Sequence, residues 1–124
     1  MRFLKVVAVV AMCVLGLSLL ASAAENKFGV ADSSKITFYD PIRVGDTLLP
    51  SGNYQVLHTM DGDRHIMVFT QLNTKRPAEA RVECQLVPLQ KKAVRTETSY
   101  VLNAANERVL HKLIFKGDSA QHVF

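Results

Sequence analysis

The residues with the clearest chemical potential are two histidines, His58 and His65, which flank a turn signal. Asp61-Gly62 is a dipeptide typical of two-residue β-hairpin turns. If these two residues form the turn, His58 lies opposite His65 on the neighbouring strand, with Cβ atoms about 5 Å apart. Two imidazoles at that spacing could bind zinc or copper. His58 and His65 are therefore the candidate metal ligands in the sequence.

This histidine pair depends on the hairpin register. A three-residue turn over 61–63 would place His58 opposite Ile66 and send His65 to the other face of the sheet, because a one-residue slip inverts every side chain. A zinc site also needs a third and usually a fourth ligand. The preferred interpretation is that both are ordinary hairpin-end histidines and that the protein has no cofactor. The histidines that could supply further ligands are His111 and His122.

Cys84 is a second candidate, as a nucleophile. It alternates in phase with Val82 and Leu86 on a predicted strand, so it belongs to the inward face. A buried thiol behaves as a small apolar residue with a raised pKa and little reactivity. Core packing is therefore the preferred interpretation. On an exposed edge the same thiol would instead form intermolecular disulfides.

The motifs of common enzyme classes are absent from the sequence. It contains no Gly-X-Ser-X-Gly elbow, no His-Glu-X-X-His and no phosphate-cradling glycine loop. Asp61-Gly62-Asp63 begins like a calcium loop, but Arg64 stands where oxygen ligands are needed. Glu79 and Glu83 share a strand face with Arg81 between them, which suits a solvated ladder better than acid-base chemistry. We expect no catalytic residues, and an enzyme would need a site built from unmarked residues.

Residues 1–23 have the pattern of a cleaved signal peptide. Arg2 and Lys5 precede an apolar run, and Ala21-Ser22-Ala23 supplies the small residues that a signal peptidase reads. The run is shorter than the span of about 20 apolar residues that crosses a membrane. Cys13 lies inside the run, so no lipid anchor is predicted either. We expect a signal helix that is removed, no transmembrane anchor in the mature chain, and a periplasmic or extracellular protein.

Removing this segment leaves 101 residues, enough for one domain. We predict a flexible leader over 24–34 and a single domain over 35–124. The formal net charge of +4 falls to +2 when Arg2 and Lys5 are removed, which is too weak to indicate a nucleic-acid partner. Cys84 becomes the one remaining cysteine, so no internal disulfide is expected.

Hydrophobic alternation with period two dominates the mature chain. Ala80, Val82, Cys84 and Leu86 alternate with charged or polar residues, as in a half-buried antiparallel strand. Turn signals recur at regular spacing and no segment has helical periodicity. We predict an all-β fold, an antiparallel β-sandwich or small barrel of seven to eight short strands. The last strand, 120–124, is expected to pair into the sheet. The other expected strands cover 36–39, 42–44, 54–60, 65–71, 79–86, 96–102 and 109–115.

One stretch carries a resemblance. The residues that carry it are Val44-Gly45-Asp46-Thr47-Leu48-Leu49-Pro50-Ser51-Gly52-Asn53-Tyr54-Gln55-Val56 and the later Leu113-Ile114-Phe115-Lys116-Gly117. These residues are similar to those of small exported β-rich proteins of unknown function from soil bacteria such as the acidobacteria. Their segment reads Leu-Pro-Ala-Gly-X-Tyr-X-Val, and Ser51 departs from the usual alanine. The resemblance implies a β-rich fold and export, and it brings no activity with it.

These features together favour an exported, non-catalytic β-domain that binds a protein or an envelope polymer, or has a structural role in the envelope. The alternatives are a metal-binding exported protein that uses His58 and His65, and a small enzyme with an unmarked site. Exposed basic residues could attract anionic polymers or lipid headgroups through screened charge. Those residues are Lys75, Arg76, Arg81, Lys91, Lys92 and Arg95.

Overall fold

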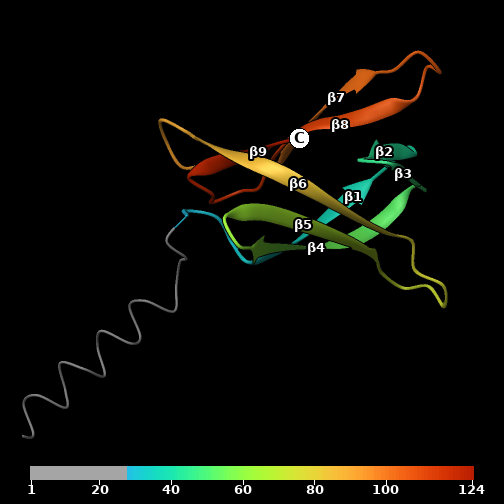
Figure 1. Cartoon of the computed structure of the whole chain (residues 1–124), viewed down its shortest axis with the longest axis horizontal. Helices are drawn as coiled ribbons and strands as arrows, with labels where there is room; N and C mark the ends of the chain where they lie inside the picture. The colour runs from blue at the N-terminus through green and yellow to red at the C-terminus, as the bar shows by residue number, and fades with distance from the viewer. Residues whose placement is uncertain (1–27) are drawn as a thin grey trace, which may run out of the picture.

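A computed structural model describes residues 28–124, and all of the regular structure in this part of the chain is β-strand (Figure 1). The expected all-β class is confirmed, but the described residues form nine strands rather than seven to eight, because Thr47–Leu49 is a strand of its own. The predicted signal peptide at 1–23 lies outside the described residues. Within them, no helix is long and apolar enough to span a membrane. The strands are β1 (Ser33–Phe38), β2 (Ile42–Val44), β3 (Thr47–Leu49), β4 (Gly52–Asp61), β5 (Arg64–Gln71), β6 (Glu79–Pro88), β7 (Glu97–Leu102), β8 (Arg108–Ile114) and β9 (Ala120–Val123).

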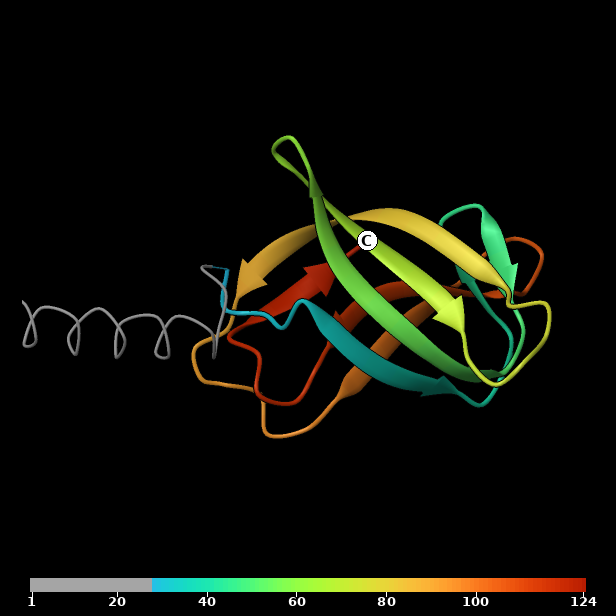
Figure 2. The ribbon, with the colours of Figure 1, turned by 90° about the horizontal axis from the view of Figure 1, so that it is seen from below.

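The strands form one open, strongly curled sheet. Hydrogen-bonded neighbours follow the order β1-β4-β5-β6-β9-β8-β2-β3, and β7 pairs with β8 off this path. Every ladder is antiparallel except the short contact of β2 with β8, which pairs Arg43 with Val109 in parallel. The curl brings β2 and β3 against β6. Figure 2 shows β1, β4 and β5 in front of β7, β8 and β9, so the molecule has two layers.

Tyr54 fixes the turn between β3 and β4 to the core. Its side chain is fully buried, as its inward phase predicts, and its hydroxyl donates a hydrogen bond to the carbonyl oxygen of Pro50 at 2.6 Å. The turn before β3 depends on Gly45, whose φ of 58° is a conformation that other residues rarely adopt. The predicted interruption at Asp40-Pro41 is also confirmed, because β1 ends at Phe38 and β2 begins at Ile42.

The core lies between the two layers. In β6, Ala80 and Cys84 are buried while Glu79, Arg81 and Glu83 are exposed, so the predicted alternation is confirmed. β9 pairs with both β6 and β8, as expected for the terminal strand. The buried core comprises Ile36, Phe38, Ile42, Val44, Leu49, Tyr54, Val56, Met67, Phe69, Ala80, Cys84, Leu110, Leu113 and Phe115.

Residues 28–34, which we expected in a flexible leader, are instead folded against the domain. Val30 is 1 % exposed, and Ser119 donates its backbone N–H to the carbonyl oxygen of Gly29 at 2.7 Å. β1 begins at Ser33. The prediction of a flexible leader rested on the polar side chains of this segment. The segment is instead held by backbone hydrogen bonds and by the buried side chain of Val30. We call residues 28–32 the strap.

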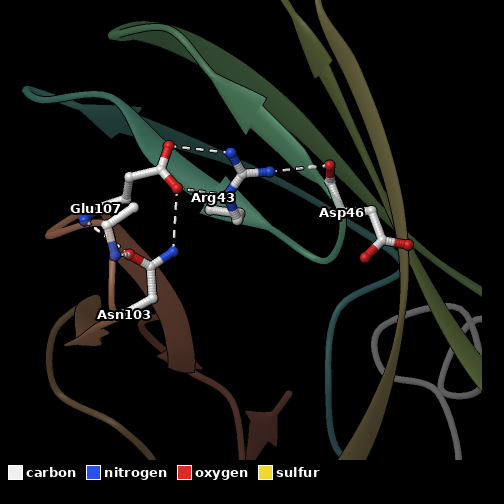
Figure 3. A network of polar contacts seen from close by, with 5 residues as sticks. Arg43, Asp46, Asn103 and Glu107 are labelled. Atoms are coloured by element: carbon white, nitrogen blue, oxygen red, sulfur yellow. Dashed lines mark hydrogen bonds and ion pairs between the residues drawn. The ribbon is translucent and has the colours of Figure 1, made fainter.

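A polar network joins β2 to the turn before β8 (Figure 3). The Arg43 guanidinium donates two hydrogen bonds to the carboxylate of Glu107, at 3.1 and 3.0 Å, and a third to the backbone oxygen of Asp46. The Asn103 amide nitrogen donates to the same carboxylate at 3.0 Å. These hydrogen bonds, from Arg43 first and then from Asn103, lower the pKa of Glu107. The network fixes the place where the sheet switches to parallel pairing.

We predict that this network makes stability depend on pH. A carboxyl group whose pKa is lower in the folded state stabilises the fold above its unfolded pKa, about 4.3 for glutamate, and loses that contribution as the pH falls through the folded value. Wild-type protein should therefore melt at a higher temperature than Glu107→Gln at pH 7. The difference should shrink below about pH 4. Thermal melts followed by circular dichroism test this, and a difference that does not vary with pH would contradict it.

Candidate functional sites

The β4–β5 hairpin turns at Gly62-Asp63, one residue later than predicted. Asp61 pairs with Arg64, and His58 pairs with Met67. Of the two loop residues only Gly62 has positive φ, 61°, which fits a type II′ turn rather than the expected type I′. Both registers considered from the sequence are therefore wrong. His58 lies directly opposite neither His65 nor Ile66.

The two histidines nevertheless meet, as diagonal neighbours on the inner face. His65 precedes Met67 by two residues, so it shares the face of Met67 and of the opposing His58. The rings stack with centroids 5.2 Å apart, and Nε2 of His58 lies 3.1 Å from Nδ1 of His65. In neutral rings one of these nitrogens donates its N–H to the other. The predicted pair exists, built by a different register.

Cys84 and His122 extend the pair into a buried cluster. Cys84 lies opposite His65 on β6, and His122 enters from β9, where it pairs with Leu86. The sulfur of Cys84 is 3.6 Å from Nδ1 of His122. One ligand atom each from His58, Cys84 and His122 lie within 4.8 Å of one another, and all three residues are buried. We call these three residues the His–Cys cluster.

Asp118 lies beside the cluster with one oxygen unsatisfied. It is 4 % exposed, and its Oδ1 accepts a hydrogen bond from the backbone N–H of Ala31 at 3.2 Å. Its Oδ2 is buried without a hydrogen-bond partner. Nε2 of His122 lies 3.7 Å from that oxygen. A buried carboxylate oxygen left in this state is costly and calls for an explanation.

The strap covers the cluster on the side of His58. The Phe28 ring packs edge-on against His65 and His58, with centroid distances of 4.8 and 6.0 Å. His58 donates its backbone N–H to the carbonyl oxygen of Asp32 at 2.8 Å. His58 is 7 % exposed and His122 only 1 %. The three residues of the cluster are therefore enclosed, whereas the neighbouring His65 is half-buried.

The surroundings of the cluster favour neutral side chains. Burial lowers the pKa of His58, and the positive charges that His122 and His65 can carry lower it further, against the opposing effect of Asp32 and Asp118. Burial raises the pKa of the Cys84 thiol to about 11, with a smaller contribution from Glu83. At neutral pH the His58 ring is therefore neutral and the Cys84 thiol is protonated.

The spatial arrangement resembles that of a catalytic triad, with Cys84 as the nucleophile, His122 as the base and Asp118 as the acid that orients the base. Cys84 is only 3 % exposed, however, and the strap closes the cluster on the side of His58. A thiol with a raised pKa is also a poor nucleophile, because the thiolate is the reactive form. The geometry therefore favours ligand binding over covalent catalysis.

The sequence pointed to only part of this cluster. His58 and the inward phase of Cys84 were recognisable from local patterns. The contribution of His122 depends on the pairing of β6 with β9, and the sequence gives no local signal for that long-range register. Ala120 and His122 do share one face of the last strand, and this alternation is the one hint that His122 points inward.

A second candidate site is a groove of about 540 Å³ between β1 and β7, which we call the seam. β1 pairs only with β4, and β7 pairs only with β8, so each has one unpaired edge. Figure 1 shows these strands in opposite layers, with β7 above β1. The apolar floor is made by Ile36, Phe38 and Ile42, and the walls and ends by Lys35, Thr37, Tyr39, Asp40, Thr96, Thr98, Tyr100 and Arg108.

The basic residues do not gather into one patch. Lys75 and Arg76 precede β6, while Lys91, Lys92 and Arg95 follow it. A ten-residue strand is about 33 Å long, so the two groups lie at opposite ends of β6. Arg95 is also paired with Glu97 at 2.8 Å. The two groups are therefore separated along β6, and Arg81 lies exposed on the strand between them.

We predict that Cys84 reacts slowly in the folded protein. Alkylation with iodoacetamide at pH 8 should be at least roughly 100-fold slower than in concentrated urea, because the thiol is buried and its pKa is raised. Mass spectrometry of timed samples measures both rates. A folded-state rate equal to the rate in urea would show an accessible thiol and would revive the nucleophile interpretation.

Comparison with known proteins leaves the geometry as the basis for function. No family model matches the chain, and no curated protein or solved structure is significantly similar to it. The resemblance to small exported β-rich bacterial proteins therefore stays a prediction. The two sites described above carry the functional argument by themselves.

Proposed function

We propose that this chain is an exported, non-catalytic β-domain that binds an extended polypeptide segment along the seam. The observation that carries the proposal is the pair of unpaired strand edges that line one groove with an apolar floor. An incoming strand can add to such an edge through main-chain hydrogen bonds. Export is part of the proposal because of the signal-like pattern of residues 1–23.

The free edge of β1 presents backbone groups to the seam. The hydrogen bond from His58 N–H to the carbonyl oxygen of Asp32 marks these residues as a hydrogen-bonded pair of the β1–β4 ladder. Such pairs alternate along antiparallel strands, so Ser34, Ile36 and Phe38 bond to β4. The N–H and C=O groups of Lys35 and Thr37 therefore point to the free edge, and both residues line the seam.

The edge of β7 has few of the features that protect natural edge strands. All six residues are exposed, and Tyr100, Val101 and Leu102 are large apolar residues at least half exposed. The stretch 98–102 has no charge and no proline. The register of the β7–β8 ladder shifts between Ser99 and Tyr100, where β8 carries one extra residue, His111. An exposed edge of this kind is a site for strand addition.

The lining of the seam indicates which strand it would accept. Ile36 and Phe38 at the floor favour a segment with apolar residues at alternate positions. At one end Arg108 is 4.0 Å from Asp40 and lies over the Tyr100 ring, 5.3 Å from its centroid. Lys35, at the β1 side, favours an acidic residue in the partner. The proposed ligand is therefore an extended peptide with alternating apolar residues and an acidic flank.

The test compares Thr37→Pro with Thr37→Ala. Both remove the side-chain hydrogen bond that Thr37 donates to Asn53 at 2.6 Å, but only proline removes the backbone N–H on the free edge. The probe is a library of linear peptides displayed on phage. We expect the wild type to select alternating apolar sequences, Thr37→Ala to bind them, and Thr37→Pro to lose at least tenfold in affinity by fluorescence anisotropy.

Two results would overturn the proposal. Peptides that bind Thr37→Pro as tightly as Thr37→Ala would show that the β1 edge is not used. A library from which the wild type selects nothing would show that the seam does not accept a peptide. Sedimentation analysis tests whether a second copy of this chain occupies the seam instead of a peptide. In that case the wild type would form a concentration-dependent dimer that Thr37→Pro loses. Matching melting temperatures of the two variants establish that both are folded.

A further inference from the structure

We infer that the His–Cys cluster of His58, Cys84 and His122 binds a thiophilic metal ion, Zn²⁺ or Cu⁺. This site is separate from the seam, since no residue of the cluster lines that groove. Imidazole and thiolate ligands are the donors that zinc and copper(I) prefer in proteins. The sequence offered His58 and His65 as candidate zinc or copper ligands, and the ligand set inferred from the structure is a different one.

The distances within the cluster are close to those of a metal centre. Zinc bonds of about 2.0–2.1 Å to nitrogen and 2.3 Å to sulfur place tetrahedral ligand atoms roughly 3.3–3.6 Å apart. Cys84 and His122 already lie at that spacing, 3.6 Å. The whole set falls within 4.8 Å. Side-chain movements of about 1 Å would therefore complete the site.

Asp118 explains how His122 would be oriented. Its unsatisfied Oδ2 faces Nε2 of His122, and Nδ1 of the same ring faces the sulfur of Cys84. If Nε2 carries the proton and donates a hydrogen bond to Asp118, the lone pair of Nδ1 points to the metal position. Carboxylate partners of this kind fix the tautomer of metal-binding histidines. The buried oxygen of Asp118 without a hydrogen-bond partner would then orient His122.

His65 supports the site without being one of the three ligands. Its Nδ1 lies 3.1 Å from Nε2 of His58, and its ring stacks on that of His58. Phe28 packs against both rings and limits their rotation. We therefore assign His65 as a positioning residue.

Charge balance is compatible with the buried position. A coordinated thiol is deprotonated outright, so the thiolate offsets one positive charge of the ion. The carboxyl group of Asp118 offsets a second for Zn²⁺. Buried charges in proteins are usually paired or bound to metals. A core that served packing alone would have no need for two histidines, a cysteine and an unsatisfied carboxylate in contact.

The test is a titration of the purified, reduced protein with Co²⁺, followed by Zn²⁺ and, without oxygen, Cu⁺. Cobalt is a visible probe for zinc sites, and a bound thiolate gives a sulfur-to-cobalt charge-transfer band in the near ultraviolet. We expect this band in the wild type and its loss when excess Zn²⁺ is added. Competition with a chelator of known affinity then measures which of Zn²⁺ and Cu⁺ binds more tightly.

The variants separate ligands from neighbours. Cys84→Ser should abolish the charge-transfer band, and His58→Gln or His122→Gln should weaken Co²⁺ binding more than 100-fold. Asp118→Asn and His65→Gln should keep the band but weaken binding by about 10- to 100-fold, as substitutions of outer-shell partners do. His111→Gln on β8, outside the cluster, is the matched control and should bind as the wild type does.

Three outcomes would overturn the inference. The first is a folded wild-type protein that shows no saturable binding of Co²⁺, Zn²⁺ or Cu⁺. The second is metal binding that His111→Gln weakens as much as His122→Gln does, and the third is metal binding that Cys84→Ser leaves unchanged. Bound metal should also raise the melting temperature of the wild type but not of Cys84→Ser. The melting curve of each metal-free variant establishes that a loss of binding is not a loss of folding.

Discussion

The passage of β6 from one layer to the other is the feature on which the rest of the structure depends. Residues 79–84 of this strand pair with β5, and residues 85–88 pair with β9. One continuous strand therefore joins the layer of β1, β4 and β5 to the layer of β7, β8 and β9. The curl of the sheet and the enclosed core follow from this switch, because each layer extends from a different half of β6.

The switch also determines where the candidate sites lie. Cys84 is the last residue of β6 that pairs with β5, so its neighbours come from both layers: His65 from β5 and His122 from β9. The ligand cluster is a consequence of this position. At the far side of the molecule the layers do not meet, and β1 and β7 are left as the two edges of the seam. One sheet thus provides a closed polar cluster and an open groove.

The features that the sequence predicted are those set by neighbouring residues. The alternation through Ala80 and Cys84, the break at Asp40-Pro41 and the inward Tyr54 all follow from local period and turn chemistry, and the structure confirms them. The hairpin register was wrong because Gly62 can take the first as well as the second loop position. The flexible leader was wrong for residues 28–34, whose polar composition hides the packing of Val30 and the backbone bonds of the strap.

The pairing of strands that are distant in the sequence could not be predicted from local patterns. The meeting of Cys84 with His122 requires the β6–β9 register, and the orientation of His122 requires Asp118, a residue with no local pattern to mark it. The closeness of the edges of β1 and β7 depends on the curl of the whole sheet. In each case the contact joins segments that local periodicity treats as independent, so only the folded structure brings them together.

X-ray absorption spectroscopy of the zinc-loaded protein identifies the ligand atoms of the bound ion and their distances. We expect one sulfur at about 2.3 Å and two imidazole nitrogens at about 2.0–2.1 Å, with the sulfur lost in Cys84→Ser. A first shell of oxygen and nitrogen alone in the wild-type protein would contradict this expectation, since Cys84 would then not be a ligand.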